Sequence, residues 1–292
     1  MSKKSKILII LLPIILILAV SVWYLSGQNV AVLQPAGVIG QKERSLIFIA
    51  LILSAVVVLP VYALTILIAW KYREGNTSAK YTPDWDHSRV LETIWWGIPL
   101  IIITILSVIT WNSSHALDPY QAIASKVKPI QVQVVALDWK WLFIYPKQHI
   151  ASVNKFVIPL NTPISFNITS DTVMNSFWLP NLGGQIYAMP GMSTTLHLMA
   201  NKAGSYYGSS ANISGKGFSG MNFTADAVSS NSYNSWISSL AKSKSVLNLN
   251  NYNKLALPST YNRVSYYKNV PDGLFENIIM KYMEPITNGS SI

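Results

Sequence analysis

The sequence predicts a membrane-anchored chain in which a transmembrane helix hairpin precedes an all-β sandwich and a short, aromatic-rich helical extension. Half of the 292 residues are hydrophobic and only 12% are charged, a composition more apolar than that of ordinary soluble domains. The long apolar runs fall within the first 111 residues. From residue 130 onward apolar side chains recur at every second position, which is the period of a half-buried strand.

Residues 1–27 are predicted to form a signal sequence or a signal anchor helix. Three lysines among the first six residues precede the uncharged run Ile7–Leu25, and a basic start followed by an apolar stretch is typical of such segments. The tetrapeptide LSGQ that ends at Gln28 resembles a bacterial lipobox with glutamine in place of the lipid-bearing cysteine, so lipidation at this site is excluded. Cleavage of the segment and its retention as a third span both stay open.

Residues 28–112 are predicted to form a transmembrane helical hairpin with spans at about 45–70 and 93–111. Both runs lack charged residues and are long enough to cross a bilayer. Pro60 and Pro99 lie inside them, where a bilayer tolerates proline as a kink. Tryptophans near both ends of the second run are typical of the aromatic belts at membrane surfaces.

The charge distribution predicts the orientation of this hairpin. Residues 71–90 carry four lysines and arginines, whereas residues 26–44 carry two. The positive-inside rule therefore places residues 71–90 and the N-terminal tail in the cytoplasm, and everything after residue 111 on the outer side.

Residues 130–228 are predicted to form the β domain, and residues 229–292 a helical C-terminal region. Alternating apolar residues mark two strands clearly: Ile130, Val132 and Val134 in one, and Ile164, Phe166 and Ile168 in another. Several such strands over about a hundred residues indicate a sandwich or barrel. The C-terminal region is rich in asparagine, serine and tyrosine, and short helices are expected at Tyr233–Lys242 and Gly273–Tyr282.

Composition excludes several classes of function. The chain has no cysteine, which rules out disulfides, thiolate metal sites and cysteine nucleophiles. Its four histidines are scattered without metal-ligand spacing. The net charge is +10, but the basic residues are spread singly rather than clustered, so no nucleic-acid partner is expected. Phosphate-binding and hydrolase motifs are also missing from the sequence.

The stretch YGSSANISGKGFSGM at residues 207–221, taken with VMNSFW at residues 173–178, resembles the copper loop of subunit II of the haem–copper respiratory oxidases. In cytochrome c oxidases that loop reads approximately Y-G-x-C-x-E-x-C-G-x-x-H-x-x-M, with a further histidine upstream. The two cysteine positions fall on Ser210 and Ser214, the glutamate on Asn212, the loop histidine on Phe218, the upstream histidine on Asn175 and the methionine on Met221. Only the methionine is retained.

This pattern is similar to the quinol-oxidase branch of the family, the bacterial cytochrome bo-type ubiquinol oxidases, whose subunit II carries no metal. A dinuclear copper centre needs thiolates and imidazoles, so no cofactor is expected in this chain. The resemblance covers about residues 25–282 and implies a cupredoxin-like fold for the β domain. It also covers the aromatic-rich C-terminal extension.

The resemblance implies a non-catalytic subunit of a complex that moves electrons from ubiquinol to oxygen and pumps protons. Haems and copper would lie in oxidase subunit I, and further small membrane subunits would be partners. The expected location is the bacterial inner membrane, with the β domain on the periplasmic side. Two alternatives stay open: a copper-binding cytochrome c oxidase subunit II, and a membrane-anchored β-domain binding protein without an oxidase partner.

Glu92 is a candidate for the entrance of a proton path. It is the last charged residue before the second span, and an acid at a helix start is favoured by the helix dipole alone. An ionisable group at a membrane boundary is nevertheless a functional candidate. In the family that this chain resembles, the glutamate at the position of Glu92 stands at the mouth of a proton path into the catalytic subunit.

Trp139 and Trp141 are candidates for an interface patch. In cytochrome c oxidases the corresponding W-x-W patch lies near the copper and receives electrons. Without copper, the expected role is structural: the two indoles would share one strand face and bury aromatic area against the partner subunit or the membrane surface.

Overall fold

The computed structural model describes residues 30–80, 82 and 84–283, together with residues 16, 20, 23, 24, 27 and 28. The predicted signal or anchor segment, residues 1–27, lies almost wholly outside the described residues. The chain divides into two compact units. One comprises Met1–Gln41 and Ile123–Ile292, and the other comprises Lys42–Ala122.

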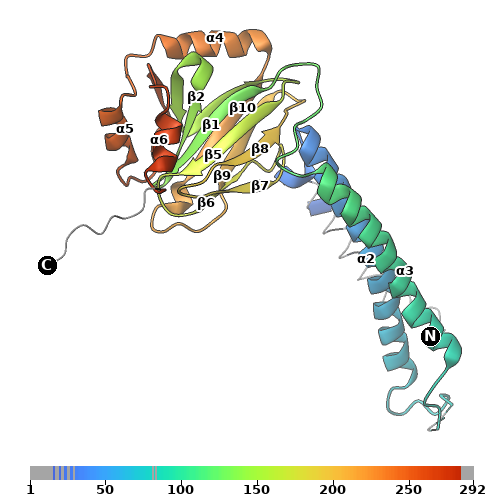
Figure 1. Cartoon of the computed structure of the whole chain (residues 1–292). Helices are drawn as coiled ribbons and strands as arrows, with labels where there is room; N and C mark the ends of the chain where they lie inside the picture. The colour runs from blue at the N-terminus through green and yellow to red at the C-terminus, as the bar shows by residue number, and fades with distance from the viewer. Residues whose placement is uncertain are drawn as a thin grey trace. The chain divides into compact units, whose positions relative to one another are not determined.

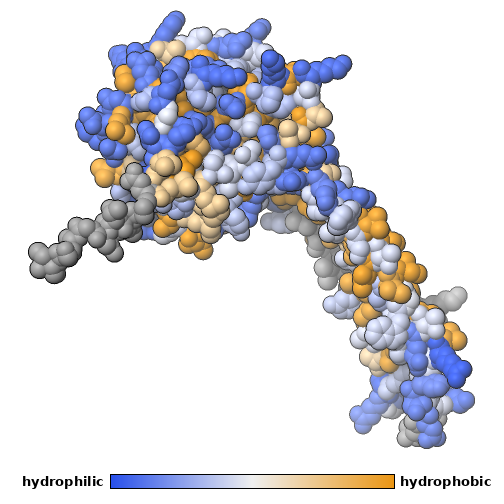
Figure 2. All heavy atoms as spheres, viewed as in Figure 1, coloured by the Kyte–Doolittle hydropathy of each residue, from blue (hydrophilic) through white to orange (hydrophobic). Residues whose placement is uncertain are grey.

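Two long helices, α2 (Val38–Lys71) and α3 (Arg89–Ala116), contain the predicted spans (Figure 1). Both are long and apolar enough to cross a membrane, and none of the most apolar stretch of either helix is buried inside the protein. Each helix extends beyond its uncharged run, because charged residues at the water-facing ends continue the backbone hydrogen-bond pattern. Figure 2 shows hydrophobic residues along these helices.

The β domain is a sandwich of two sheets. The strands are β1 (Ile130–Leu137), β2 (Lys140–Tyr145), β3 (Ile150–Val153), β4 (Lys155–Pro159), β5 (Ile164–Ser170), β6 (Asn175–Trp178), β7 (Gln185–Ala188), β8 (Thr194–Leu198), β9 (Gly204–Ser210), β10 (Asn222–Val228) and β11 (Ser265–Lys268). The six-stranded sheet has the order β11-β3-β2-β1-β5-β8, and the five-stranded sheet has the order β4-β10-β9-β6-β7. The β1–β5 and β4–β10 pairs are parallel, and the other strand pairs are antiparallel.

The core between the two sheets is aromatic. Phe177 of β6 and Phe223 of β10 stack with ring centroids 4.9 Å apart, and Phe143 meets Phe223 edge-on at 5.3 Å. The alternating residues that predicted strands, such as Val132 and Phe166, point into this core and are fully buried. The predicted fold class, a helix hairpin followed by a β-sandwich and a helical extension, is confirmed.

The C-terminal region covers the outer face of the six-stranded sheet with its residues after 241 and packs residues 230–241 against the core between the sheets. It contains the helices α4 (Ser230–Ala241), α5 (Leu249–Ala256) and α6 (Leu274–Met280), and the short 3-10 turns η1 (Ala31–Leu33), η2 (Pro146–Gln148) and η3 (Phe218–Gly220) lie elsewhere in the same unit. Tyr252 and Phe275 pack with Leu142 and Ile144 in a second buried cluster. Consequently all six residues of β2 are buried, as expected for a strand that is covered on both faces.

The sequence analysis predicted helices in this region but missed β11. This strand pairs antiparallel with β3, with Tyr266 opposite Ser152 and Tyr267 opposite Ala151. β11 therefore makes the C-terminal region part of the main sheet rather than a separate tail.

A buried carboxylate fastens the end of this region. The Asp171 side chain is 1% exposed and accepts hydrogen bonds from the Tyr252 hydroxyl at 2.6 Å and the Tyr282 hydroxyl at 2.9 Å. The Lys281 ammonium lies 2.7 Å from the same carboxylate. Burial and the Asp171 hydrogen bond raise the pKa of Tyr252 well above its usual range, so its hydroxyl remains a donor at neutral pH.

We predict that Asp171→Asn loosens the C-terminal region. The amide keeps the shape of the carboxylate, but it cannot accept all three donors or balance the Lys281 charge. The free energy of unfolding should fall by about 1–3 kcal/mol, and hydrogen exchange should accelerate over α6. The control is Asp226→Asn, which breaks the partly exposed pair with Lys155 and should cost about 1 kcal/mol or less. Equal losses in the two variants would contradict the prediction.

Candidate functional site

Two of the six positions that the resemblance aligned with copper ligands, Asn175 and Ser210, are brought together where β6 meets the end of β9. Asn175 of β6 is fully buried, and its side-chain oxygen accepts a hydrogen bond from the Ser210 hydroxyl at 2.9 Å. The Asn175 amide donates to the Val173 carbonyl at 2.9 Å. Ser210 also reaches the backbone carbonyl of Asn212, at 3.3 Å. A buried hydroxyl–amide pair thus occupies the positions that correspond, by the resemblance, to a cysteine and a histidine of cytochrome c oxidases.

The remaining positions form a second group in the β9–β10 loop. The Asn212 side chain accepts a hydrogen bond from Ser176. The Ser214 hydroxyl lies 3.9 Å from the sulfur of Met221, which is 1% exposed. Phe218 begins η3, and its carbonyl accepts the Met221 amide at 2.9 Å. Phe218 contributes only backbone to this arrangement.

The side chains at these positions do not fit a copper centre. Neutral hydroxyl and amide oxygens are poor ligands for Cu(I), and the phenyl ring of Phe218 cannot act as a ligand. Asn175, Ser210 and Asn212 are also committed to protein hydrogen bonds. Within the described part of the chain, no three His, Cys, Asp or Glu side chains are grouped closely enough to hold a metal ion.

The structure corrects the prediction for Trp139 and Trp141. The two indoles do not share a strand face, because Trp139 lies in the turn before β2 with a left-handed φ of 60°. Trp141 is fully buried and meets Phe177 edge-on at 5.5 Å, so it contributes to the core and cannot contact a partner subunit. Only Trp139 is partly exposed.

Trp139 covers the β9–β10 loop instead. Its indole N–H donates to the carbonyl of Ser214 at 3.1 Å. A Cβ atom added to Gly217 would lie 2.4 Å from the Trp139 ring, so the ring can pack there only because residue 217 is glycine. Trp139 therefore holds the loop in place.

Lys140 is a buried, hydrogen-bonded residue that the sequence analysis missed. Its side chain is buried, and the ammonium donates to the Leu257 carbonyl at 2.8 Å and to the Ser259 hydroxyl at 2.5 Å. Burial lowers the pKa of Lys140, and the nearby Asp138 opposes this shift. In the sequence, a lysine between two tryptophans indicates a strand residue whose side chain faces solvent. No sequence pattern predicts that the C-terminal region covers this side chain.

Lys140 anchors residues 257–262, which are called the crossing segment because they pass over the β9–β10 loop. A Cβ atom at Gly217 would lie 2.7 Å from Thr260, and one at Gly220 would lie 2.8 Å from the Tyr261 ring. The Tyr261 hydroxyl also lies 3.1 Å from that of Ser219. The aromatic-rich C-terminal region and the former copper loop therefore pack as one surface.

Glu92 lies in the first turn of α3. Its carboxylate accepts the backbone N–H of Ser88 at 3.2 Å, and Ser88 is the N-cap of the helix. This hydrogen bond satisfies a donor that helix geometry leaves free, and the negative charge suits the positive end of the helix dipole. A capping role for Glu92 thus has direct geometric support.

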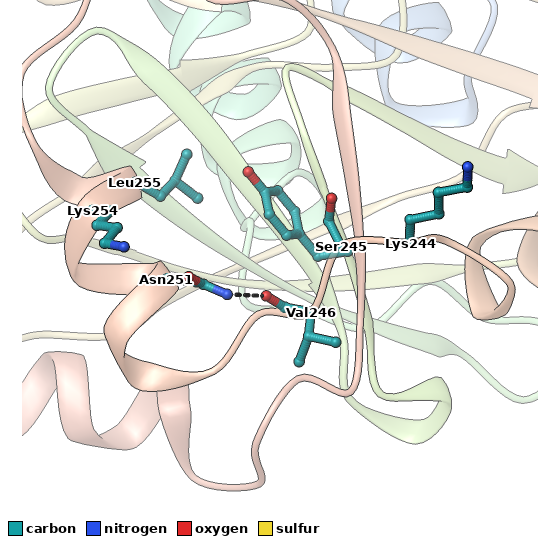
Figure 3. Close-up of a pocket in the computed structure, with 7 residues that line it drawn as sticks. Lys244, Ser245, Val246, Asn251, Lys254 and Leu255 are labelled. Atoms are coloured by element: carbon teal, nitrogen blue, oxygen red, sulfur yellow. Dashed lines mark hydrogen bonds between the residues drawn. The ribbon is translucent and has the colours of Figure 1, made fainter.

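A cavity of about 620 Å³ in the C-terminal region lacks the grouped reactive side chains of a catalytic site. It is lined by Lys244, Ser245, Val246, Asn251, Lys254, Leu255 and Tyr267. In Figure 3 the two lysines lie on opposite sides, and the Asn251 amide already donates to the Val246 carbonyl at 2.8 Å. The lining residues present neither a nucleophile–base pair nor an acid, so the cavity does not form a reaction site.

Comparison with known proteins agrees with this geometry. Residues 127–228 match the family described as cytochrome c oxidase subunit II, periplasmic domain, and residues 241–285 match the COX aromatic rich motif. The chain therefore falls in the subunit II class of the haem–copper oxidases.

Full-length relatives narrow this class. The chain is 51% identical over 258 residues to cytochrome bo(3) ubiquinol oxidase subunit 2 of Pseudomonas putida, covering 88% of this chain and 82% of the relative. It is 50% identical over 260 residues to ubiquinol oxidase subunit 2 of Acetobacter aceti, covering 88% and 84%. It is 45% identical over 265 residues to cytochrome bo(3) ubiquinol oxidase subunit 2 of Buchnera aphidicola subsp. Baizongia pistaciae, covering 90% and 93%. The chain belongs to the ubiquinol oxidase subunit 2 family, as its sequence predicted.

We predict that the purified chain takes up no copper at the β9–β10 loop. Metal analysis after incubation with copper should give well under one atom per chain, because no thiolate or imidazole occupies a ligand position. The matched comparison carries Ser210→Cys, Ser214→Cys, Asn212→Glu, Phe218→His and Asn175→His together. Stoichiometric copper in the unaltered chain would refute the prediction whatever the restored variant binds.

Proposed function

We propose that this chain is a non-catalytic subunit of a membrane complex that transfers electrons from ubiquinol to oxygen and pumps protons. The observation that carries the proposal is the hydrogen-bonded Asn175–Ser210 pair in a chain 51% identical to a ubiquinol oxidase subunit 2. Neither side chain can exchange electrons, and both are poor ligands for copper. The chain would instead provide docking surface and support assembly, and the copper-binding alternative is disfavoured by the same pair.

The proposed partner is oxidase subunit I, which would hold the haems and the copper, together with further small membrane subunits. Two helices able to span a membrane support an anchored subunit. The family match of residues 127–228 to a periplasmic domain supports an outer location for the β domain. We infer that the complex lies in the bacterial inner membrane.

Purification through a tag on this chain tests the proposal. A multi-span haem protein should co-purify, the preparation should oxidise ubiquinol with uptake of oxygen, and all redox metal should belong to the partner. Isolation of the chain from native membranes without any haem protein would refute the assignment and would favour a membrane-anchored binding protein.

The topology can be tested with single cysteines, because the chain has none of its own. Ser78→Cys lies in the connection between α2 and α3, and Ser245→Cys lies in the C-terminal region; both positions are exposed. An impermeant thiol reagent added to intact spheroplasts should label residue 245 and spare residue 78 until the membrane is opened. The reverse pattern would show that the orientation is wrong.

We further propose that Glu92 stands at the entrance of a proton path into subunit I. It lies at the start of a candidate span, where water meets the membrane interior, and its carboxylate can bind and release protons there. The cap on Ser88 does not exclude this role, because it uses one carboxylate oxygen.

Glu92→Gln separates the two roles of Glu92. The glutamine oxygen can still accept the Ser88 N–H, so assembly and haem content should be normal. The side chain can no longer exchange protons, so oxygen consumption and proton pumping by the complex should fall several-fold, with partial recovery in Glu92→Asp. The control, Glu74→Gln, removes an exposed acid from the connection between α2 and α3 and should leave turnover unchanged. Full turnover in an assembled Glu92→Gln complex would show that Glu92 acts only as a helix cap.

A further inference from the structure

A hollow at the end of α2 joins an apolar wall to two lysines. It has a volume of about 730 Å³ and is lined by the last turns of α2 and by the segment that connects α2 to α3. Leu67 and Ile68 form its apolar side, and Lys71 and Lys80 form its basic side. In Figure 2 hydrophobic residues along the helices give way to hydrophilic residues at this end of the unit.

The apolar side faces outward rather than into a protein core. Leu67 is 45% exposed, Ile68 is 55% exposed, and Trp85, which also lines the hollow, is 63% exposed. Tryptophan is enriched where lipid headgroups meet acyl chains. Leu67 and Ile68 belong to the last turns of a helix that is able to span a membrane, and Trp85 lies in the connection that follows the helix.

The two lysines offer unneutralised positive charge. Among the described residues, no carboxylate lies within salt-bridge distance of Lys71 or Lys80. The acids of the same connection, Glu74, Asp84 and Asp86, do not line the hollow. A cavity lined by two lysines and by apolar side chains, at the end of a helix able to span a membrane, matches a molecule with an anionic head and an acyl tail.

We propose that this hollow binds one anionic phospholipid. Lys71 and Lys80 contact the phosphate-bearing head, the acyl chain begins along Leu67 and Ile68, and the Trp85 indole lies at the level of the glycerol backbone. The proposal requires that α2 span a membrane but is independent of electron transfer or proton pumping by the complex.

Single cysteines report on the occupant, because the chain has no other thiol. Ala79→Cys lies in the wall of the hollow, whereas its neighbour Ser78→Cys is exposed and lies outside it. The oxidase complex that contains either variant is placed in nanodiscs of phosphatidylcholine, with or without phosphatidylglycerol. The rate of alkylation by uncharged N-ethylmaleimide is then measured on this chain by mass spectrometry.

Phosphatidylglycerol should slow alkylation at residue 79 severalfold and leave residue 78 nearly unchanged. Each basic residue strengthens attachment to an anionic lipid surface about fivefold, so Lys71→Gln with Lys80→Gln should weaken phosphatidylglycerol binding about thirtyfold and abolish the protection of residue 79. The control, Arg73→Gln with Arg89→Gln, removes the same charge from residues that do not line the hollow and should keep most of the severalfold protection.

Three outcomes would overturn the proposal. Equal loss of protection in the two double variants would mean general attraction to a charged surface. Protection of residue 79 in pure phosphatidylcholine would mean that another protein segment covers the hollow. Protection by inorganic phosphate without phosphatidylglycerol would mean that the site takes a free anion rather than a lipid.

Discussion

The arrangement of the β domain and its C-terminal region depends on the hydrogen bonds of one buried ammonium group. Lys140 lies on β2, on the face opposite the aromatic core, and a charge buried there is stable only if its donors are satisfied. Its acceptors, the Leu257 carbonyl and the Ser259 hydroxyl, come from a segment more than a hundred residues later in the chain. The lysine thereby fixes where the C-terminal region crosses the sandwich.

The hydrogen bonds continue from this ammonium into the strands. Ser259 donates to the side chain of Asn262, whose backbone carbonyl accepts the Asn154 amide at 3.0 Å. The Asn154 side-chain oxygen in turn accepts the backbone N–H of Trp141 at 2.8 Å. The crossing segment is thus tied to the strand that contains Lys140 from two directions, and the loop beneath it keeps its shape through packing, with no need for metal ligands.

Sequence reasoning identified the two long apolar helices and the alternating strands because each is encoded locally, and the same local motif spacing carried the assignment of the copper-ligand positions, which stays a prediction. The alternation of apolar and polar residues around Val132 and Phe166 predicts that both occupy buried strand positions. The assignment of Ser210 and Asn175 rests on motif spacing. Trp139 was misplaced because a two-residue turn with a left-handed residue interrupts the alternation. The burial of Lys140 depends on Leu257, and no local pattern carries that contact.

The continuous apolar run in β2 has a structural consequence for the C-terminal region. A sandwich sheet with one solvated face would leave Leu142 and Ile144 in water, but both are buried against Tyr252, Phe275 and their neighbours. β11 adds backbone pairing at the edge beside β3, and Asp171 secures the final helix. Removal of the aromatic-rich region would therefore expose a hydrophobic sheet face and an open strand edge together, and would take away the Tyr252, Lys281 and Tyr282 donors of Asp171. The β domain and its extension are consequently one folding unit.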